Sequence, residues 1–201
     1  MLISLLFDSP LLFFLVFSAL VISICIHEFA HAFVADKLGD PTPRQFGRVT
    51  LNPRAHLDPL GTLFLVFAGF GWGRPVPINI YNLRNPKRDA AIISFAGPLS
   101  NFLMAGLFAL LIRFTVGGLF TQFFYFLIFY NLVLGVFNLL PLHPLDGFKV
   151  VNGVLPTRLS WQWEQMAPYG IYLLLLLAFT GSVSRLLNPF LSFAFKVFGL
   201  E

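Results

Sequence analysis

Three long apolar runs dominate the sequence, at residues 11–35, 90–112 and 119–140. Each exceeds the roughly 20 apolar residues that a helix needs to cross about 30 Å of hydrocarbon. Ser9 and Pro10 directly precede the first run. A Ser cap followed by Pro in the first turn is a typical helix start. The pattern therefore predicts three membrane-spanning helices.

The region after the first run has a different pattern. Residues 60–72 are apolar but too few to cross the bilayer as a helix. This predicts a re-entrant or partly buried segment. Residues 73–82 are expected to be extended, because Pro75 and Pro77 are incompatible with a helix interior.

Two weaker runs near the C-terminus, at 169–179 and 186–200, predict a further helix pair. Asn188, Pro189 and Lys196 interrupt the second run, so we expect that helix to lie shallow or tilted. The whole pattern predicts an all-α polytopic membrane protein with about five transmembrane helices and a re-entrant or extended segment after the first.

Composition agrees with a membrane location. The 201 residues are 57% hydrophobic and 11% charged, and their mean hydropathy is +0.81, whereas a soluble domain carries about 25% charged residues. No stretch is polar enough to form a soluble module. We therefore expect one membrane-embedded domain over residues 1–201, with a core at about 10–150 and the C-terminal helix pair at about 166–200. The single cysteine, Cys25, excludes an internal disulfide and fits a small core residue.

The basic residues are concentrated in one region. The formal net charge is +4, and eight of the thirteen Lys and Arg residues lie between positions 37 and 88. Cytoplasmic loops are enriched in Lys and Arg, so this loop is expected on the cytoplasmic side of the cell membrane. The C-terminal ends of the first and third runs then face that side together. No basic helix or aromatic-basic repeat indicates a nucleic-acid partner.

The first run contains His27-Glu28-Phe29-Ala30-His31, an H-E-x-x-H motif. Residues four apart lie on one face of a helix, so the two imidazoles can bind one Zn²⁺. Glu28 lies beside them and can act as a general base toward the attacking water. His27 comes sixteen residues after Leu11, which is about 24 Å along a helix. The metal is therefore expected inside the bilayer, toward the cytoplasmic face.

The membrane setting makes chance an unlikely explanation for this motif. Ionisable residues in an apolar span are costly, and they persist where they are paired, bind metal or line a wet cavity. A catalytic zinc ion normally has three protein ligands. The candidates for the third are His56, Asp58, His143 and Asp146. Spacing favours Asp146 only modestly, because it follows the third run on the same side as His31.

Four motifs together resemble the site-2 protease family of intramembrane zinc metalloproteases. They are HEFAH at 27–31, LNPRAHLDPLG at 51–61, AGPLSN at 96–101 and NLLPLHPLDG at 138–147. They occur in the expected order over about residues 10–150, which makes the combination far more specific than any one motif.

The resemblance implies one zinc ion per chain and places its third ligand at Asp146, which matches the Asp of the family's N-x-x-P-x-x-P-L-D-G motif. It also implies that Glu28 is the general base. The expected reaction is hydrolysis of peptide bonds within or near transmembrane segments of membrane-protein substrates.

Asn101 matches a family position near the active site, which implies a hydrogen bond to the substrate carbonyl or the developing oxyanion. From the sequence alone, hydrogen bonding between helices explains Asn101 equally well. Asn138 has the same two explanations. We expect His56 and Asp58 to structure their loop, and His143 to lie near the metal without binding it.

The chain departs from many relatives in having no region long or polar enough for a PDZ domain or a CBS pair. Substrate selection is then expected in the membrane core, through accessory membrane proteins or in a homo-oligomer. No helix is expected before the HEFAH span. Polar loops at 36–59 and 141–165 could admit water, and residues 76–81 could pair with an unwound substrate as an added strand.

Two rival functions fit part of the pattern. A membrane scaffold could retain the zinc site for structure, and an ion or metal transporter could use intramembrane His, Asp and Glu as its pathway. A transporter should carry ionisable residues toward both sides of the membrane, whereas this sequence concentrates them toward one.

Overall fold

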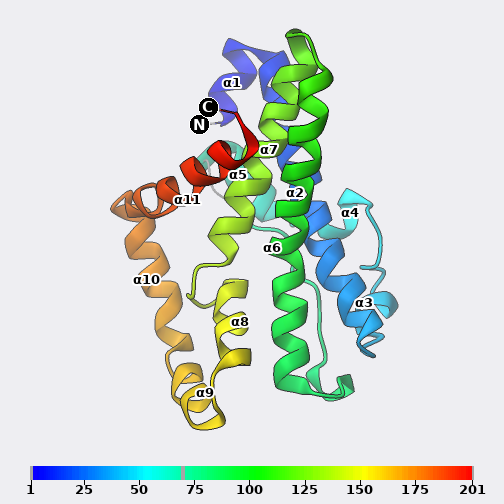
Figure 1. Cartoon of the computed structure of the whole chain (residues 1–201), viewed down its shortest axis with the longest axis vertical. Coiled ribbons are helices and arrows are strands. Elements are labelled where there is room, and N and C mark those ends of the chain that lie inside the picture. The colour runs from blue at the N-terminus through cyan, green and yellow to red at the C-terminus, as the bar shows by residue number, and fades with distance from the viewer. Residues whose placement is uncertain (1, 69–70, 201) are drawn as a thin grey trace.

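The computed structural model describes residues 2–68 and 71–200, and over these residues the chain is helical without β-strands (Figure 1). The α-helices are α1 (Leu2–Asp8), α2 (Pro10–Lys37), α3 (Thr42–Gln45), α4 (Pro53–His56), α5 (Pro59–Ala68), α6 (Pro86–Leu111), α7 (Gly118–Asn138), α8 (Asp146–Val154), α9 (Thr157–Glu164), α10 (Ala167–Phe179) and α11 (Ser182–Phe198), with 3₁₀ turns η1 (Ile80–Asn82) and η2 (Ile112–Phe114).

Three long helices form the centre of the molecule. They are α2, α6 extended through η2, and α7, and each is long and apolar enough to cross a membrane. They pack against one another around fully buried apolar side chains such as Ile93, Ala105, Ile128 and Leu132. The three spans expected from the apolar runs are confirmed as helices of sufficient length.

The predicted C-terminal helix pair is present, but its count as two membrane spans is not confirmed. Helices α10 and α11 have 13 and 17 residues and meet at a bend of 85°. They amount to one broken span at most, so the described chain has three or four candidate spans, and the count of about five is not confirmed. The break falls at Gly181, whose φ of +66° lies in the left-handed region that favours glycine.

Helix starts follow their sequence signals. Pro10 occupies the first turn of α2 as expected, although the Ser9 side chain makes no capping hydrogen bond. Helix α6 begins with Pro86, and the Asp89 carboxylate accepts a hydrogen bond of 2.9 Å from the backbone N–H of Asn85. The seven-residue helix α1 precedes α2 and packs against it, so the expectation of no helix before the HEFAH span is wrong.

The segment expected to be re-entrant enters and leaves at one place. Leu57 and Gly73 form an isolated antiparallel bridge, and the Arg74 N–H donates to the His56 carbonyl at 2.7 Å. Between them, α5 has ten residues, or about 15 Å of helix, which is half of a hydrocarbon core. Residues 69–70 of the expected segment lie outside the described residues. Beyond Gly73 the chain forms no helix until residue 79, as predicted, but residues 80–82 of the stretch expected to be extended form the 3₁₀ turn η1.

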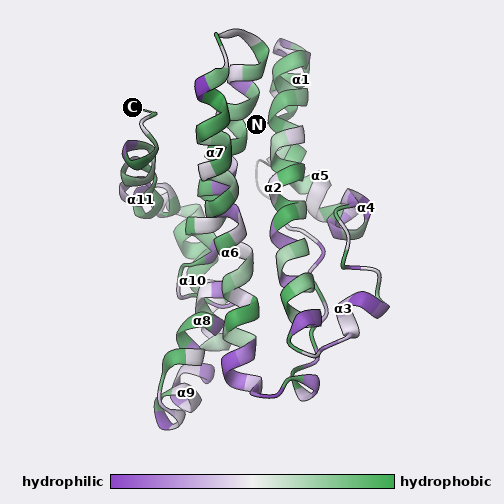
Figure 2. Cartoon of the chain, turned by 45° about the vertical axis from the view of Figure 1, so that its right-hand side comes forward, coloured by the Kyte–Doolittle hydropathy of each residue, from purple (hydrophilic) through white to green (hydrophobic). Residues whose placement is uncertain are grey.

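Polar residues gather at one end of the helical core. In Figure 2 the hydrophilic colours concentrate on α3, α4, α9 and the first turns of α6, whereas the upper parts of α2 and α7 are mostly hydrophobic. At the polar end, α7 stops at Asn138, and Pro141 and Pro144 occupy the irregular connection to α8. This connection brings the start of α8 beside α2 and α6.

Candidate metal centre

Two histidines on α2 form one side of a buried cluster. His27 and His31 lie one helical turn apart, with 4% and 7% of their surface exposed. Their Nε2 atoms are 3.0 Å apart, and their rings are nearly perpendicular. The i, i+4 spacing therefore directs both ring nitrogens toward one point.

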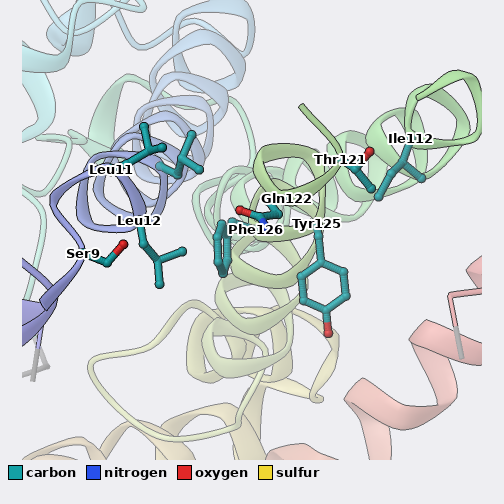
Figure 3. Close-up of a pocket in the computed structure, with 9 residues that line it drawn as sticks. Ser9, Leu11, Leu12, Ile112, Thr121, Gln122, Tyr125 and Phe126 are labelled. Carbon is teal, nitrogen blue, oxygen red and sulfur yellow. The ribbon is translucent and has the colours of Figure 1, made fainter. Parts of the chain in front are cut away.

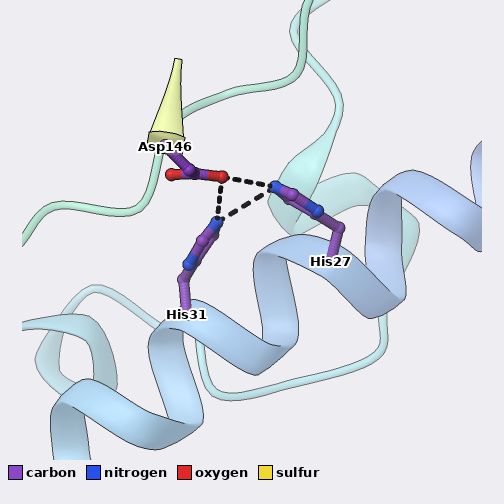
Figure 4. Close-up of side chains that lie close together, drawn as sticks. All are labelled: His27, His31 and Asp146. Carbon is purple, nitrogen blue, oxygen red and sulfur yellow. Dashed lines mark hydrogen bonds and ion pairs between the residues drawn. The ribbon is translucent and has the colours of Figure 1, made fainter. Parts of the chain in front are cut away.

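Asp146 completes the cluster from another element. It is the first residue of α8, and its Oδ2 atom lies 3.1 Å from Nε2 of His27 and 3.2 Å from Nε2 of His31 (Figure 4). The loop between α7 and α8 thus brings together residues that are more than a hundred positions apart. The other three candidates for a third ligand lie outside this cluster.

The outer nitrogens of both imidazoles are engaged by acceptors on α6. Nδ1 of His31 lies 2.7 Å from the Ile93 carbonyl, and Nδ1 of His27 lies 2.7 Å from Oδ1 of Asn101. A backbone carbonyl only accepts hydrogen bonds, so Nδ1 of His31 carries the proton. With Asn101 accepting likewise, both Nε2 atoms present lone pairs toward the Asp146 oxygen.

Three lone-pair atoms converging at 3.0–3.2 Å repel one another unless a cation lies between them. Two imidazole nitrogens and one carboxylate oxygen are a typical donor set for zinc. A tetrahedral zinc ion with bonds of about 2.1 Å separates its ligand atoms by roughly 3.3 Å. The triangle formed by His27, His31 and Asp146 fits that ion closely and leaves one side open.

Gly97 allows α6 to approach the two imidazoles. A Cβ atom built at this position would overlap ring atoms of both His27 and His31 at well under 3.0 Å. Any side chain here would therefore displace the histidines. The glycine of the AGPLSN motif is a steric requirement of the cluster, in addition to being a small residue for helix packing.

A cavity of about 170 Å³ adjoins the cluster, which is room for several water molecules. Glu28 lines it, and its carboxylate lies next to Gly73, where a Cβ would come 3.5 Å from Oε1. The wall combines the cluster with polar side chains from α6 and α7, a lysine of α8 and the extended segment. The lining residues are His27, Glu28, His31, Pro75, Val76, Ile78, Ser94, Asn138, Pro144, Asp146 and Lys149.

The structure gives Asn101 a different position from the one that its expected role requires. It is fully buried and does not line the cavity. Its amide donates to the Ser23 carbonyl at 3.2 Å and to Oδ1 of Asn131 at 2.8 Å, so both hydrogens are used. The prediction that Asn101 binds a substrate carbonyl or oxyanion is not supported. Asn138, in contrast, faces the cavity, and its amide also donates to the Leu134 carbonyl at 3.0 Å.

The remaining candidates lie in structural positions. His56 is fully buried, and its Nε2 lies 2.7 Å from the Thr50 carbonyl. Asp58 accepts a hydrogen bond of 2.8 Å from the Gly61 N–H at the start of α5. The His143 ring packs edge-on against Phe148, outside the cluster. These contacts agree with loop-structuring roles for the first two residues.

The extended segment after Gly73 is anchored at both ends. At one end the buried Arg48 guanidinium donates to the carbonyls of Ala55 and Arg74. At the other end Oδ2 of Asp40 accepts from the Asn79 N–H at 2.7 Å, and Oδ1 accepts from the Asn82 amide at 2.8 Å. Burial raises the pKa of the Asp40 carboxyl, but these hydrogen bonds and two from Thr42 outweigh it and hold the pKa below its ordinary value. The anchor therefore stays ionised near neutral pH.

Larger cavities lie away from the cluster. One of about 580 Å³ opens between the start of α2 and the start of α7, lined mainly by apolar side chains such as Leu12, Leu15 and Phe126 (Figure 3). Its lining contains no histidine and no carboxylate. In a bilayer such a groove suits acyl chains, so it is not a candidate for chemistry.

Several residues of the site were missed by the sequence reasoning. Lys149 lines the cavity one turn after Asp146 on α8, a spacing that the sequence displays. Ser23 and Asn131 contact Asn101 from two different helices. Both are polar residues in apolar spans, which was the available signal, because such residues usually make buried hydrogen bonds.

Comparison with known proteins agrees with this geometry. Residues 15–118 and 115–179 match the model of peptidase family M50. The chain is 42% identical to YwhC of Bacillus subtilis over 184 residues, 86% of this chain and 84% of the relative. It is 31% identical to Rip2 of Mycolicibacterium smegmatis over 86% of this chain and 70% of the relative.

A more distant relative is the zinc metalloprotease MJ0392 of Methanocaldococcus jannaschii, 24% identical over 96% of this chain and 50% of the relative. YwhC and Rip2 are provisionally named zinc metalloproteases, and MJ0392 is named one outright. No solved structure matches the chain significantly. The chain therefore belongs to peptidase family M50, the site-2 protease family of membrane zinc metalloproteases.

Proposed function

We propose that the protein hydrolyses peptide bonds within or near transmembrane segments of other membrane proteins, with His27, His31 and Asp146 as the zinc ligands. The observation that carries the proposal is the convergence of three lone-pair atoms beside Glu28. Both histidines and Glu28 lie in a helix that is long and apolar enough to span a bilayer. A protease site at that depth acts on substrates that share the membrane.

The chemistry follows the donor set and the cavity. A zinc ion at the cluster would activate water and polarise the scissile carbonyl. Glu28 takes one proton as the water attacks and returns it to the leaving amine, so the carboxylate is regenerated in each cycle. Its position on the cavity wall, one residue from His27, supports this role.

Two other side chains of the cavity wall are available to the developing oxyanion. Asn138 and Lys149 both line the cavity. An amide or ammonium donor that is already in place costs no reorganisation when charge develops. We assign this role to Asn138 in place of Asn101, and Lys149 adds positive charge at the same wall.

The extended segment is the proposed binding site for an unwound substrate. Pro75, Val76 and Ile78 line the cavity. In the part of the chain that the structure describes, the backbone groups of Val76 and Ile78 make no hydrogen bonds. Because Pro75 and Pro77 lack N–H groups, only the edge that carries the N–H groups of residues 76 and 78 can pair with another strand. A substrate strand added there would lie alongside the metal cluster.

We place this end of the molecule on the cytoplasmic side. The Lys- and Arg-rich region between α2 and α6 lies at the polar end of the helices in Figure 2. The same end carries the polar loops that give water a route to the cavity. The positive-inside rule supports this orientation.

Replacement of Glu28 by Gln tests the reaction. The full-length protein in detergent would be incubated with a panel of transmembrane peptides, and fragments would be read by mass spectrometry. We expect cleavage to fall by about 10²- to 10⁴-fold, because the general base is lost, while zinc content stays at one per chain. Asp146→Ala should lose both zinc and cleavage.

The same variants separate the rival functions. Unchanged behaviour of Glu28→Gln in every assay, with no fragments from the wild type, would favour a zinc-stabilised scaffold. Zinc flux into sealed vesicles without peptide cleavage would favour a transporter. Either result would overturn the proposed reaction.

A proline scan of the extended segment tests substrate binding. Ile78→Pro removes an N–H group from the pairing edge, and Ile78→Val retains it with a similar side chain. We expect the Pro variant to lower cleavage at least about tenfold, since hydrogen bonds of the added strand provide affinity. Zinc content should be unchanged in both variants. Equal cleavage by the two variants would exclude pairing at this edge.

A further inference from the structure

We propose that Asn131 and Ser23, neither of which reaches the cavity, act with Asn101 as positioning residues that hold the His27 ring in its metal-binding orientation. The inference rests on the proposed function only in taking the cluster as a zinc site. Its basis is a hydrogen-bonded chain across α2, α6 and α7 in which every donor and acceptor can be assigned.

The chain of contacts begins at two backbone carbonyls. The Asn131 amide donates to the Leu127 carbonyl at 2.8 Å and to Oγ of Ser23 at 2.8 Å. Ser23 in turn donates its hydroxyl proton to the Ala19 carbonyl at 2.8 Å. Ser23, Asn101 and Asn131 are each fully buried, so no water competes for these groups.

The carbonyls determine the direction of the whole chain. The Leu127 carbonyl can only accept, so the NH₂ group of Asn131 must face it and the Asn131 oxygen must face Asn101. Asn101 must therefore present its NH₂ group to Asn131, and the Ser23 carbonyl demands the same orientation. The Asn101 oxygen is left facing His27.

The consequence for His27 is a single protonation pattern. Its Nδ1 atom, 2.7 Å from the Asn101 oxygen, must donate, and its Nε2 atom must offer a lone pair to the metal position. His31 reaches the same pattern more directly, through the Ile93 carbonyl. The orientation of His31 is thus fixed by a backbone carbonyl. The orientation of His27 is fixed by a hydrogen-bonded relay of three side chains, those of Asn101, Asn131 and Ser23.

The relay also explains why polar side chains are retained at these positions. Buried polar groups in a span are costly when unpaired, and here each side-chain hydrogen has a partner. Partners of a histidine ligand orient the ring, and removing them typically costs about 10- to 100-fold in metal affinity. Asn131 therefore contributes to zinc binding from the far side of Asn101.

The test observes the ring N–H groups directly. Full-length zinc-loaded protein labelled with ¹⁵N-histidine and held in detergent would be studied by NMR, which resolves the ring N–H protons and reports their hydrogen bonds. Zinc affinity would be measured separately by competition with a chelator. Neither measurement requires substrate, so a failure of the proposed proteolysis would not obscure the result.

We expect wild-type His27 and His31 each to give the signal of a hydrogen-bonded Nδ1–H group. Asn101→Leu should shift the His27 signal to that of an N–H without an acceptor and lower zinc affinity by about 10- to 100-fold. Asn131→Leu should act in the same direction by several-fold, because the Ser23 carbonyl still orients Asn101. His31 should be unchanged in each variant, which makes it an internal control for folding.

Asn101→Asp separates the acceptor for His27 from the donors behind it. A carboxylate accepts from Nδ1 at least as well as an amide does, so the His27 N–H signal should stay hydrogen-bonded. Because the carboxylate cannot donate to the Ser23 carbonyl and the Asn131 oxygen, part of the zinc affinity should be lost. Loss of the His27 signal in Asn101→Asp would overturn the inference. An unchanged His27 signal in Asn101→Leu would overturn it as well, as would equal disturbance of both histidines.

Discussion

The two sides of the candidate metal centre are built in different ways. His27 and His31 stand on a 28-residue helix in the middle of the molecule, and α6 holds both rings by hydrogen bonds and close backbone approach. Asp146 stands at the end of a seven-residue irregular connection, at the first turn of a nine-residue helix. The histidine side is fixed by the packing of α2 against α6 and opens only toward the cavity, whereas the aspartate side depends on a loop and its supports.

The supports of the loop come from the C-terminal half. The Trp163 ring stacks on Phe148 with centroids 5.1 Å apart and donates its N–H to the Phe148 carbonyl at 3.0 Å. Gly170 of α10 packs directly against the His143 backbone. The C-terminal helices therefore matter to the site through the loop that carries Asp146. A rigid histidine pair and a more compliant carboxylate would let the open side of the cluster adapt to substrate.

Among variants that keep the three proposed ligands and their hydrogen-bond partners, the largest loss of zinc affinity is expected from Gly97→Ala, which changes the rigid side. The added Cβ overlaps both imidazoles, and α6 is held too firmly to retreat. Overpacking a tight site costs about 1–3 kcal/mol, so zinc affinity should fall by about 10- to 100-fold. Competition with a chelator measures the loss.

Gly106→Ala is the matched control on the same helix. Its Cβ would lie 3.5 Å from the Phe198 ring, an ordinary contact, so zinc affinity should be unchanged. If Gly97→Ala also binds zinc normally, the histidine side is not the rigid one and the comparison fails.

The sequence predicted the histidine side of the site better than the aspartate side. The histidines could be paired from spacing alone, because i, i+4 neighbours on one helix meet wherever the helix lies. Asp146 could not, because its position relative to α2 depends on how the connection after Asn138 folds. Spacing left four candidates open, and the family resemblance favoured the one that the structure brings to the histidines.

Two other differences have physical causes. The role expected for Asn101 depended on which way its amide points, and that direction is set by the Leu127 and Ser23 carbonyls on other helices. The expected count of about five spans is not confirmed, because apolar composition does not show whether neighbouring helices align. Gly181 was visible in the sequence, but the 85° bend there depends on packing of α11 against α7.

An intermediate loss of zinc affinity is expected from Gly170→Ala, which changes the helix that supports the connection carrying Asp146. The added Cβ overlaps the His143 backbone and should push the connection toward the cluster. Because a loop can shift more cheaply than a packed helix, zinc affinity should fall only about three- to tenfold. Chelator competition and peptide cleavage should decline together.

The comparison makes this variant informative in both directions. A loss as large as that of Gly97→Ala would mean that Asp146 is held as firmly as the histidines. No loss would mean that α10 does not support the connection, and the C-terminal helices would then have no part in the site.

The smallest effect on zinc is expected from Leu191→Ala on α11, which touches neither side. Leu191 is 9% exposed and packs in the cluster of apolar side chains that includes Ile128 and Leu132. Truncating a buried Leu costs about 2–5 kcal/mol when the cavity does not collapse, so the melting temperature in detergent should fall. Zinc affinity should stay within about twofold, because Leu191 belongs neither to the proposed ligands nor to their hydrogen-bond partners. Phe190→Ala, at a position that is 56% exposed, should change neither the melting temperature nor the zinc affinity.

A large loss of zinc affinity in Leu191→Ala would show that α11 affects the metal centre through α7. The division between a fixed centre and a separable C-terminal helix would then be wrong.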